Sequence, residues 1–184
     1  MFVLADDQGS VDLGCYSTEE RAHFGGGSAG PYRGAKFSLL EGGIRLPAII
    51  SWPSTLPRRE ARNQVAHACD WLPTLAELTG VTPPADLDGR SLSAVLQDRT
   101  VPSPHAEHPL HWQVGTGPNA SWAVREGDWK LIGRTRDTTD GRVPKDVSMF
   151  LADLKTDPGE KTNLAHEHPH IVDRLQELHN RHLE

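Results

Sequence analysis

The chain has 184 residues, of which 36% are hydrophobic and 24% are charged. This length and composition exclude a short peptide and predict a globular protein of one domain, or one domain with a small appendage. The 25 acidic residues outnumber the 19 basic ones for a net charge of -6, so nucleic acid is not an expected partner. No apolar run approaches the ~18 residues of a membrane helix, so no membrane association is expected.

The first predicted element is a short strand. Residues 2–5 are apolar and are followed by Asp6, Asp7 and a turn at Gly9, which places two carboxylates where open α/β sheets bind ligands. Paired carboxylates suit Ca²⁺ or Mg²⁺, whereas the alternative is a solvated acidic turn. The N-terminus lacks the basic and apolar regions of a signal peptide. No export signal is therefore expected in this chain, and its cellular location stays open.

A glycine-rich loop comes next. Residues 25–30 consist of glycine, serine and alanine and are expected to be flexible, and the loop continues to Lys36. The compact ammonium of Lys36 is a candidate partner for a sulfate or phosphate oxygen. Arg33 and Arg45 lie nearby in sequence, and each cation has the alternative of an ordinary surface position. After a glycine pair, residues 44–52 are expected to form a strand that Pro53 ends.

The middle of the chain predicts one helix and several loops. The helix is expected to start near Asp70, with Pro73 in its first turn and Gly80 at its end. Residues 82–90 are expected to be a loop, and residues 91–96 a helical turn. The zinc-like spacing of three histidines is broken by a proline, which favours structural or surface roles: these are His105, His108 and His111.

The C-terminal third predicts an antiparallel sheet. Residues 122–125 and 129–132 flank a tight turn, and residues 149–151 add a third strand. A final amphipathic helix carries Ile171, Leu175 and Leu178 on its apolar face. We expect this helix to cover a sheet formed within residues 122–154, with each buried leucine contributing ~1.5 to 3 kcal/mol.

Several linked motifs carry a family resemblance. These are LADDQG at 4–9, DLGCY at 12–16, GPYRGAK at 30–36, LEGGIRLPA at 40–48, DWLPTLAELTG at 70–80, DGRSL at 88–92, AVREGDWKL at 123–131 and the segment 154–164. Together they resemble the type I sulfatase family, which comprises arylsulfatase-like enzymes of the alkaline-phosphatase-like superfamily. The resemblance covers nearly the whole chain.

The resemblance implies a fold and a site. The expected fold is α/β, with a partial alkaline-phosphatase-like core over residues 1–100 and a C-terminal subdomain, an antiparallel sheet with a helix, over residues 101–184. Asp6 and Asp7 would hold Ca²⁺ or Mg²⁺, and Lys36 would contact the sulfate of a sulfate ester or sulfated glycan. We therefore expect the three side-chain tips to lie within ~10 Å of one another, as ligands of one ion and one anion do.

The catalytic signature of the family does not occur in this sequence. Sulfatases of this kind convert the cysteine of C-x-[PA]-x-R to formylglycine, but Cys15 is followed by YSTE and Cys69 by DWLP. Both cysteines are expected to be free or buried thiols, and formylglycine is not expected.

The step from Tyr16 to Ser17 resembles a junction at which the family's central region is missing. An internal deletion, a gene-model error or a degenerate paralogue would each give this pattern. The sequence thus predicts an inactive sulfatase-family protein. The alternatives are a non-catalytic metal- or sulfoglycan-binding remnant and, less favoured by LEGGIR, a phosphoryl hydrolase.

Overall fold

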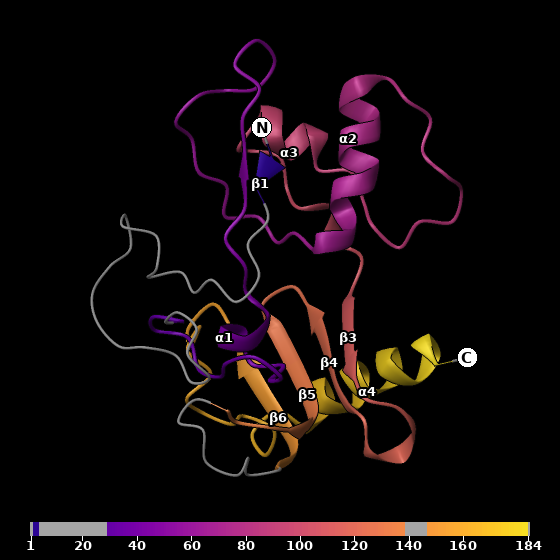
Figure 1. Cartoon of the computed structure of the whole chain (residues 1–184). Coiled ribbons are helices and arrows are strands. Elements are labelled where there is room, and N and C mark those ends of the chain that lie inside the picture. The colour runs from indigo at the N-terminus through magenta and orange to yellow at the C-terminus, as the bar shows by residue number, and fades with distance from the viewer. Residues whose placement is uncertain (1, 4–28, 139–146, 184) are drawn as a thin grey trace. The chain divides into compact units, whose positions relative to one another are not determined.

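The computed structural model describes residues 2–3, 29–138 and 147–183, and these form two compact units. We call residues 49–110 the helical unit, and residues 29–48, 111–138 and 147–183 the sheet unit (Figure 1). The two are described separately. The expected boundary near residue 100 between a core and a C-terminal subdomain stays a prediction.

The sheet unit is built on four strands in the order β3-β4-β5-β6. Their bounds are Leu110–Val114, Ser121–Glu126, Trp129–Thr135 and Val147–Asp153. Strands β4 and β5 are antiparallel and meet at the pair Glu126 and Trp129, and β5 and β6 are antiparallel as well. The short 3-10 turn η5 (Gly117–Asn119) precedes β4. The predicted antiparallel sheet is therefore confirmed, with β3 as a further strand.

Helix α4 (Pro169–His182) covers one face of this sheet (Figure 1). Its Ile171 and Leu175 pack against Val124, Leu131 and Leu151, which lie on neighbouring strands. The side chain of Leu175 is 0% exposed. Because side chains alternate along a strand, the residues between these face the other way. The predicted docking of the amphipathic helix is confirmed.

The opposite face of the sheet is buried as well. Ala123, Ile132 and Phe150 point to this side and pack against Leu39 and Leu40 of the preceding segment. A sheet that is apolar on both faces requires cover on both. The segment 39–44 supplies this cover, and it follows directly on the loop that carries Lys36.

The helical unit contains α2 (Trp71–Thr79) and α3 (Ser93–Gln97). The 3-10 turn η3 (Ala68–Asp70) leads into α2, and η4 (Pro104–Ala106) lies near the end of the unit. Helix α2 ends at Gly80, whose φ of 72° is left-handed, as in the common C-terminal cap. The predicted helix near 70–80 and the helical turn near 91–96 are both confirmed.

The predicted strand over residues 44–52 is too long. Residues Glu41–Ile44 form a single helical turn, α1, and only Ile49–Ile50 form a strand, β2. The Arg45 N–H donates to Glu41 O at 2.9 Å, a helical bond that the glycine pair at 42–43 permits and that an extended strand could not make. Strand β2 pairs with β1 (Phe2–Val3) in a two-stranded sheet.

The expectations for Asp6 and Asp7 concern residues that the structure does not describe. Asp6 and Asp7 lie among residues 4–28, so their predicted proximity to Lys36 and their predicted role in metal binding stay predictions. Lys36, the expected contact to the sulfate, lies within the described residues. In the part of the chain that is described, no helix has the length and apolar character needed to cross a bilayer.

Candidate functional site

Lys36 lies at the corner of a tight turn in the sheet unit. The Ser38 N–H donates to Ala35 O at 3.0 Å, which closes a four-residue turn with Lys36 and Phe37 at its centre. Phe37 has a φ of 74°, so the turn is of the kind that requires a left-handed third residue and usually takes glycine there. Lys36 and Phe37 are both exposed. The turn thus places Lys36 and Phe37 at the surface.

The turn is anchored to the segment that follows β5. The Thr138 hydroxyl accepts the Ala35 N–H at 3.0 Å and lies 3.1 Å from Ala35 O. On the other side of the turn, the Ser38 hydroxyl donates to Arg136 O at 2.6 Å and accepts the Leu40 N–H at 3.2 Å. Ser38 and Thr138 are both buried. Hydrogen bonds therefore fix the backbone immediately before and after Lys36.

Two glycines allow the loop to lie directly on α1. A Cβ on Gly42 would approach Gly34 O to 2.3 Å, and a Cβ on Gly43 would approach Ser38 O to 2.2 Å. The Gly42 N–H donates to Arg33 O at 2.7 Å in the space that this leaves. The LEGGIR segment thus has a structural explanation: its glycines admit the loop backbone that carries Lys36.

Three charged side chains are buried beneath this loop. Glu41 begins α1, Lys130 lies on β5, and Glu160 follows β6. Lys130 Nζ lies 2.9 Å from Glu41 Oε1 and 3.0 Å from Glu160 Oε1, and Lys130 and Glu160 are both 0% exposed. Glu160 Oε2 also accepts the Glu41 backbone N–H. Burial raises the pKa of Glu160, an effect that the Lys130 ammonium opposes. We call this group the buried charge cluster.

The two arginines near Lys36 have different surroundings. Arg33 Nε donates to Asp137 Oδ2 at 2.6 Å, and its Nη1 donates to Glu160 O at 2.9 Å. Arg45 lies over the Tyr32 ring at 4.4 Å and is about half exposed at 49%. Arg33 therefore serves to hold the segment in place, whereas Lys36 and Arg45 are both exposed.

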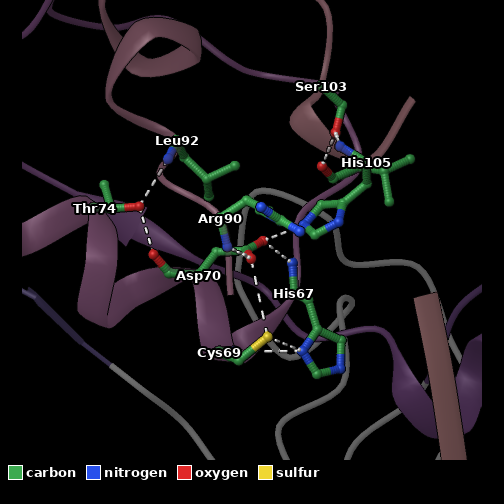
Figure 2. Close-up of polar contacts among 9 residues, drawn as sticks. His67, Cys69, Asp70, Thr74, Arg90, Leu92, Ser103 and His105 are labelled. Carbon is green, nitrogen blue, oxygen red and sulfur yellow. Dashed lines mark hydrogen bonds and ion pairs between the residues drawn. The ribbon is translucent and has the colours of Figure 1, made fainter. Parts of the chain in front are cut away.

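The helical unit contains a separate polar cluster around Asp70 (Figure 2). Asp70 Oδ2 accepts the His67 N–H at 2.6 Å and lies 2.7 Å from His105 Nε2, while Oδ1 accepts the Arg90 N–H at 2.8 Å. Asp70 is 0% exposed. Thr74 extends the cluster, because its hydroxyl donates to Asp70 O and accepts the Leu92 N–H. One buried carboxylate therefore joins three loops and the start of α2.

Cys69 lies beside this cluster, and its surroundings keep it a neutral thiol. Its Sγ lies 2.9 Å from His67 Nδ1, which also accepts the Cys69 backbone N–H at 3.3 Å. A nitrogen that accepts a backbone proton carries none itself, so the thiol is the donor. Burial and the nearby Asp70 raise the pKa of Cys69, and burial lowers the pKa of His67. Cys69 is a free, exposed cysteine; the expectation that it is not converted to formylglycine stays a prediction.

Of the three histidines with zinc-like spacing, His105 and His111 lie in different units. His105 is bound to Asp70 in the helical unit, whereas His111 in the sheet unit lies against α4, with Nε2 2.8 Å from His179 Nδ1. The structural role predicted for His105 is confirmed. Within the described ranges no three metal-binding side chains converge on one point.

The buried charge cluster was missed by the sequence interpretation. A signal for it exists, because Lys130 lies in the otherwise apolar run WKLI and alternation puts it on the same face as Ile132. A charge at such a position requires a buried partner. The sequence alone does not say that the partners are Glu41 and Glu160.

Known proteins resemble the chain over most of its length. Residues 35–184 match the family described as N-sulphoglucosamine sulphohydrolase, C-terminal. An N-acetylgalactosamine-6-O-sulfatase of Bacteroides thetaiotaomicron is 27% identical over 97% of the chain and 35% of its own length. Human arylsulfatase A is 31% identical over 83% of the chain and 33% of its own length.

A solved structure agrees with these relatives. It comes from a Bacteroides thetaiotaomicron locus for the metabolism of multiple glycosaminoglycans, with a TM-score of 0.65 and 28% identity over 83% of the chain and 32% of its own length. The chain thus spans about a third of the relatives and of the solved structure that it matches. The match over residues 35–184 includes the Lys36 loop, both glycines of α1 and the whole sheet unit beyond them. The chain belongs to the sulfatase family, through the family's C-terminal domain.

Proposed function

We propose that this chain binds the sulfate group of a sulfated sugar through Lys36 and, in its 184-residue form, does not hydrolyse sulfate esters. The observation that carries the proposal is the turn at residues 35–38, which presents the exposed Lys36 ammonium on a backbone anchored on both sides. A backbone that is already ordered lowers the entropic cost of binding an anion, because less of the loop has to be fixed on binding.

The chemistry of the loop suits a sulfate. Lys36 offers three donors with a full positive charge, and Arg45 is a second exposed cation on the same segment. Sulfate keeps its charge at all physiological pH values, so its binding needs cations and donors but no titrating base. The names of the relatives, an N-acetylgalactosamine-6-O-sulfatase among them, support a sulfated sugar as the ligand class.

The proposed inactivity follows from the missing nucleophile. Neither Cys15 nor Cys69 lies in the C-x-[PA]-x-R signature, and the raised pKa of Cys69 disfavours the thiolate form. Removing the nucleophile of a serine protease costs ~10⁶ in rate. A loss of this size would leave an aryl sulfate assay at background.

A divalent cation is part of the proposal through Asp6 and Asp7. Two carboxylates are suitable donors for Ca²⁺ or Mg²⁺, and because Ca²⁺ takes about six to eight oxygens, further ligands would have to join them. A bound cation would polarise the sulfate oxygens. Calorimetric titration with Ca²⁺ should give binding that Asp7→Asn weakens and that a Lys36→Gln variant keeps.

The direct test combines a binding and a turnover measurement. Inorganic sulfate and N-acetylgalactosamine-6-sulfate are titrated into the wild type, Lys36→Gln and Lys155→Gln, the last as a matched change of an exposed lysine on a different turn. We expect Lys36→Gln alone to lower the affinity, by about tenfold or more for one lost charged contact. Equal affinity in all three proteins would refute the role of Lys36.

Turnover is measured after coexpression with a formylglycine-generating enzyme, with an aryl sulfate as substrate and added Ca²⁺. We expect background rates and an intact mass without conversion of either cysteine to the aldehyde. Hydrolysis that disappears on mutating Asp7 or Lys36 would show that the chain is a working enzyme and would refute the proposed inactivity.

A further inference from the structure

Glu160 lies in a turn that is held in an unusual conformation. Its φ of 51° is left-handed, which is uncommon for a residue other than glycine and persists only where the surroundings fix it. Asp157 provides the fixation: its Oδ2 accepts the backbone N–H groups of Lys161 and Thr162 at 2.7 and 2.9 Å, and its carbonyl accepts the Glu160 N–H. The turn therefore sets the direction of the Glu160 side chain.

From this turn Glu160 contacts both ends of the segment that carries Lys36. At one end, its backbone carbonyl accepts Arg33 Nη1 at 2.9 Å. At the other end, its carboxylate accepts the backbone N–H of Glu41. Lys36 lies between these two points of attachment, three residues after Arg33 and five before Glu41.

Burial makes these contacts difficult to replace. Glu160 and Lys130 are both 0% exposed, so in the intact protein their charges are satisfied by protein groups and not by bulk solvent. Glu160 Oε1 faces Lys130 Nζ at 3.0 Å in an ion pair, and it accepts no regular hydrogen bond within the described part of the chain. Buried ion pairs of this kind contribute little net stability. Their presence here is better explained by what they fix in place.

We propose that Glu160 is a positioning residue that holds the Lys36 loop in its anion-binding conformation, through the Glu41 backbone, Lys130 and Arg33. This inference rests on the proposed function of Lys36, and it adds a determinant 124 residues further along the sequence. Glu160 does not touch the anion. It holds the backbone from which the Lys36 side chain extends.

The first test measures the loop itself and does not depend on any ligand. Amide hydrogen exchange is compared in the wild type, Glu160→Ala, Glu160→Gln and the exposed control Glu167→Ala. We expect the Ala35, Glu41 and Gly42 amides to exchange about tenfold faster or more in Glu160→Ala, because local opening exposes hydrogen-bonded amides. The Leu131 amide in the sheet should keep its wild-type rate.

A stability-matched variant separates positioning from general destabilisation. Leu175→Ala removes packing from the opposite face of the sheet and should lower the unfolding midpoint without selectively opening the loop. Glu160→Gln keeps an acceptor for the Glu41 N–H and should restore part of the loop protection, and it remains informative if Glu160→Ala does not fold. Loop amides that exchange in both Glu160 variants as they do in Glu167→Ala would overturn the proposal.

The second test links the loop to sulfate. We expect Glu160→Ala to weaken inorganic sulfate binding about tenfold, and Leu175→Ala to leave it within about twofold at a temperature where both are folded. In a Lys36→Gln background, Glu160→Ala should have no further effect. An additive effect in that background would contradict positioning through Lys36. A wild type that binds no sulfate would refute the proposed function, while the exchange experiment would still decide the role of Glu160.

Discussion

Both units contain buried carboxylates, but the groups that interact with these carboxylates differ between the two units. In the helical unit, the Asp70 carboxylate accepts two backbone N–H groups, lies against His105 Nε2 and is approached by the Cys69 thiol. In the sheet unit, Glu41 and Glu160 share one fully buried ammonium, Lys130. The first arrangement is made of hydrogen bonds to nearby loops, whereas the second is a cluster of full charges.

The surroundings explain the difference. The sheet unit has apolar cores on both faces of its sheet, so its strands are stable without polar cross-links. The helical unit consists of short helices and loops, and Asp70 joins the segments at residues 67, 90 and 105. A carboxylate that accepts several N–H bonds can organise loops. A buried ion cluster instead fixes one geometry, at a cost in desolvation.

The largest effect is expected from Lys130→Met. The substitution leaves Glu41 and Glu160 as buried carboxylates without a cation, which destabilises by about 3 to 5 kcal/mol. Urea unfolding monitored by circular dichroism measures the change, with Lys155→Met as an exposed control expected within about 0.5 kcal/mol. A small loss of unfolding free energy in Lys130→Met would show that Glu41 and Glu160 do not depend on the Lys130 ammonium in solution.

Leu175→Ala should cost about 2 to 5 kcal/mol. The side chain is 0% exposed against β4, β5 and β6, and its truncation leaves a cavity that the sheet cannot close. Leu183→Ala, at the exposed end of the same helix, should change the unfolding free energy by less than about 0.5 kcal/mol. Equal losses in both variants would contradict the docking of α4.

Asp70→Asn should lower the free energy of unfolding by less, about 1 to 3 kcal/mol. The asparagine NH₂ would face a backbone N–H group that now donates to a carboxylate oxygen, so one hydrogen bond is lost. Asp88→Asn, an exposed neighbour in the same unit, is the matched control. Near-ultraviolet circular dichroism and urea unfolding report the change. If Asp70→Asn lowered the unfolding free energy more than Lys130→Met does, the hydrogen-bonded carboxylate would matter more for stability than the buried charge cluster, which contradicts the expected order.

The smallest effect is a pH dependence at the end of α4. His111 stacks on His182 with ring centroids 3.9 Å apart, and Trp122 stacks on His179 at 3.8 Å. Burial, followed by the nearby His182 and His179, lowers the pKa of His111 from 6.5 to about 4. The unfolded chain therefore binds more protons between these values, and stability is lost as pH falls from about 6.5 to about 4.

Thermal unfolding between pH 7.5 and 4.5 tests this dependence. We expect the midpoint to fall over that window in the wild type, and to fall less in His111→Gln, which lacks the titrating ring. A midpoint that is equally pH-dependent in both proteins would assign the effect to other groups.

The regular parts of the fold could be predicted from the sequence. The apolar spacing of Ile171, Leu175 and Leu178 and the turn at residues 126–128 are local signals, and both led to confirmed elements. The strand expected at 44–52 is limited to Ile49–Ile50, and the glycine pair before it lies in a helical turn instead. Those glycines permit both the helical turn α1 and the close approach of the Lys36 loop.

The site could be predicted only in part. Lys36 follows from its loop and from the family motif, but its anchors do not, because Thr138 binds Ala35 across 103 residues and Glu160 binds Glu41 across 119. No local pattern encodes such pairs. Asp70 was correctly placed at the start of a helix, yet its role as the link to His105 depends on a loop 35 residues away.

The central claim, that Lys36 contacts sulfate, is tested most directly by nuclear magnetic resonance of the lysine side chains. The chain is labelled with ¹³C at lysine Cε, and the Lys36 signal is identified by its loss in Lys36→Gln. Sodium sulfate is then added at constant ionic strength, with sodium chloride as the reference salt. We predict a saturable shift of the Lys36 signal in sulfate but not in chloride, with the Lys155 signal unchanged. A Lys36 signal that does not move, or that moves equally in both salts, would contradict the account.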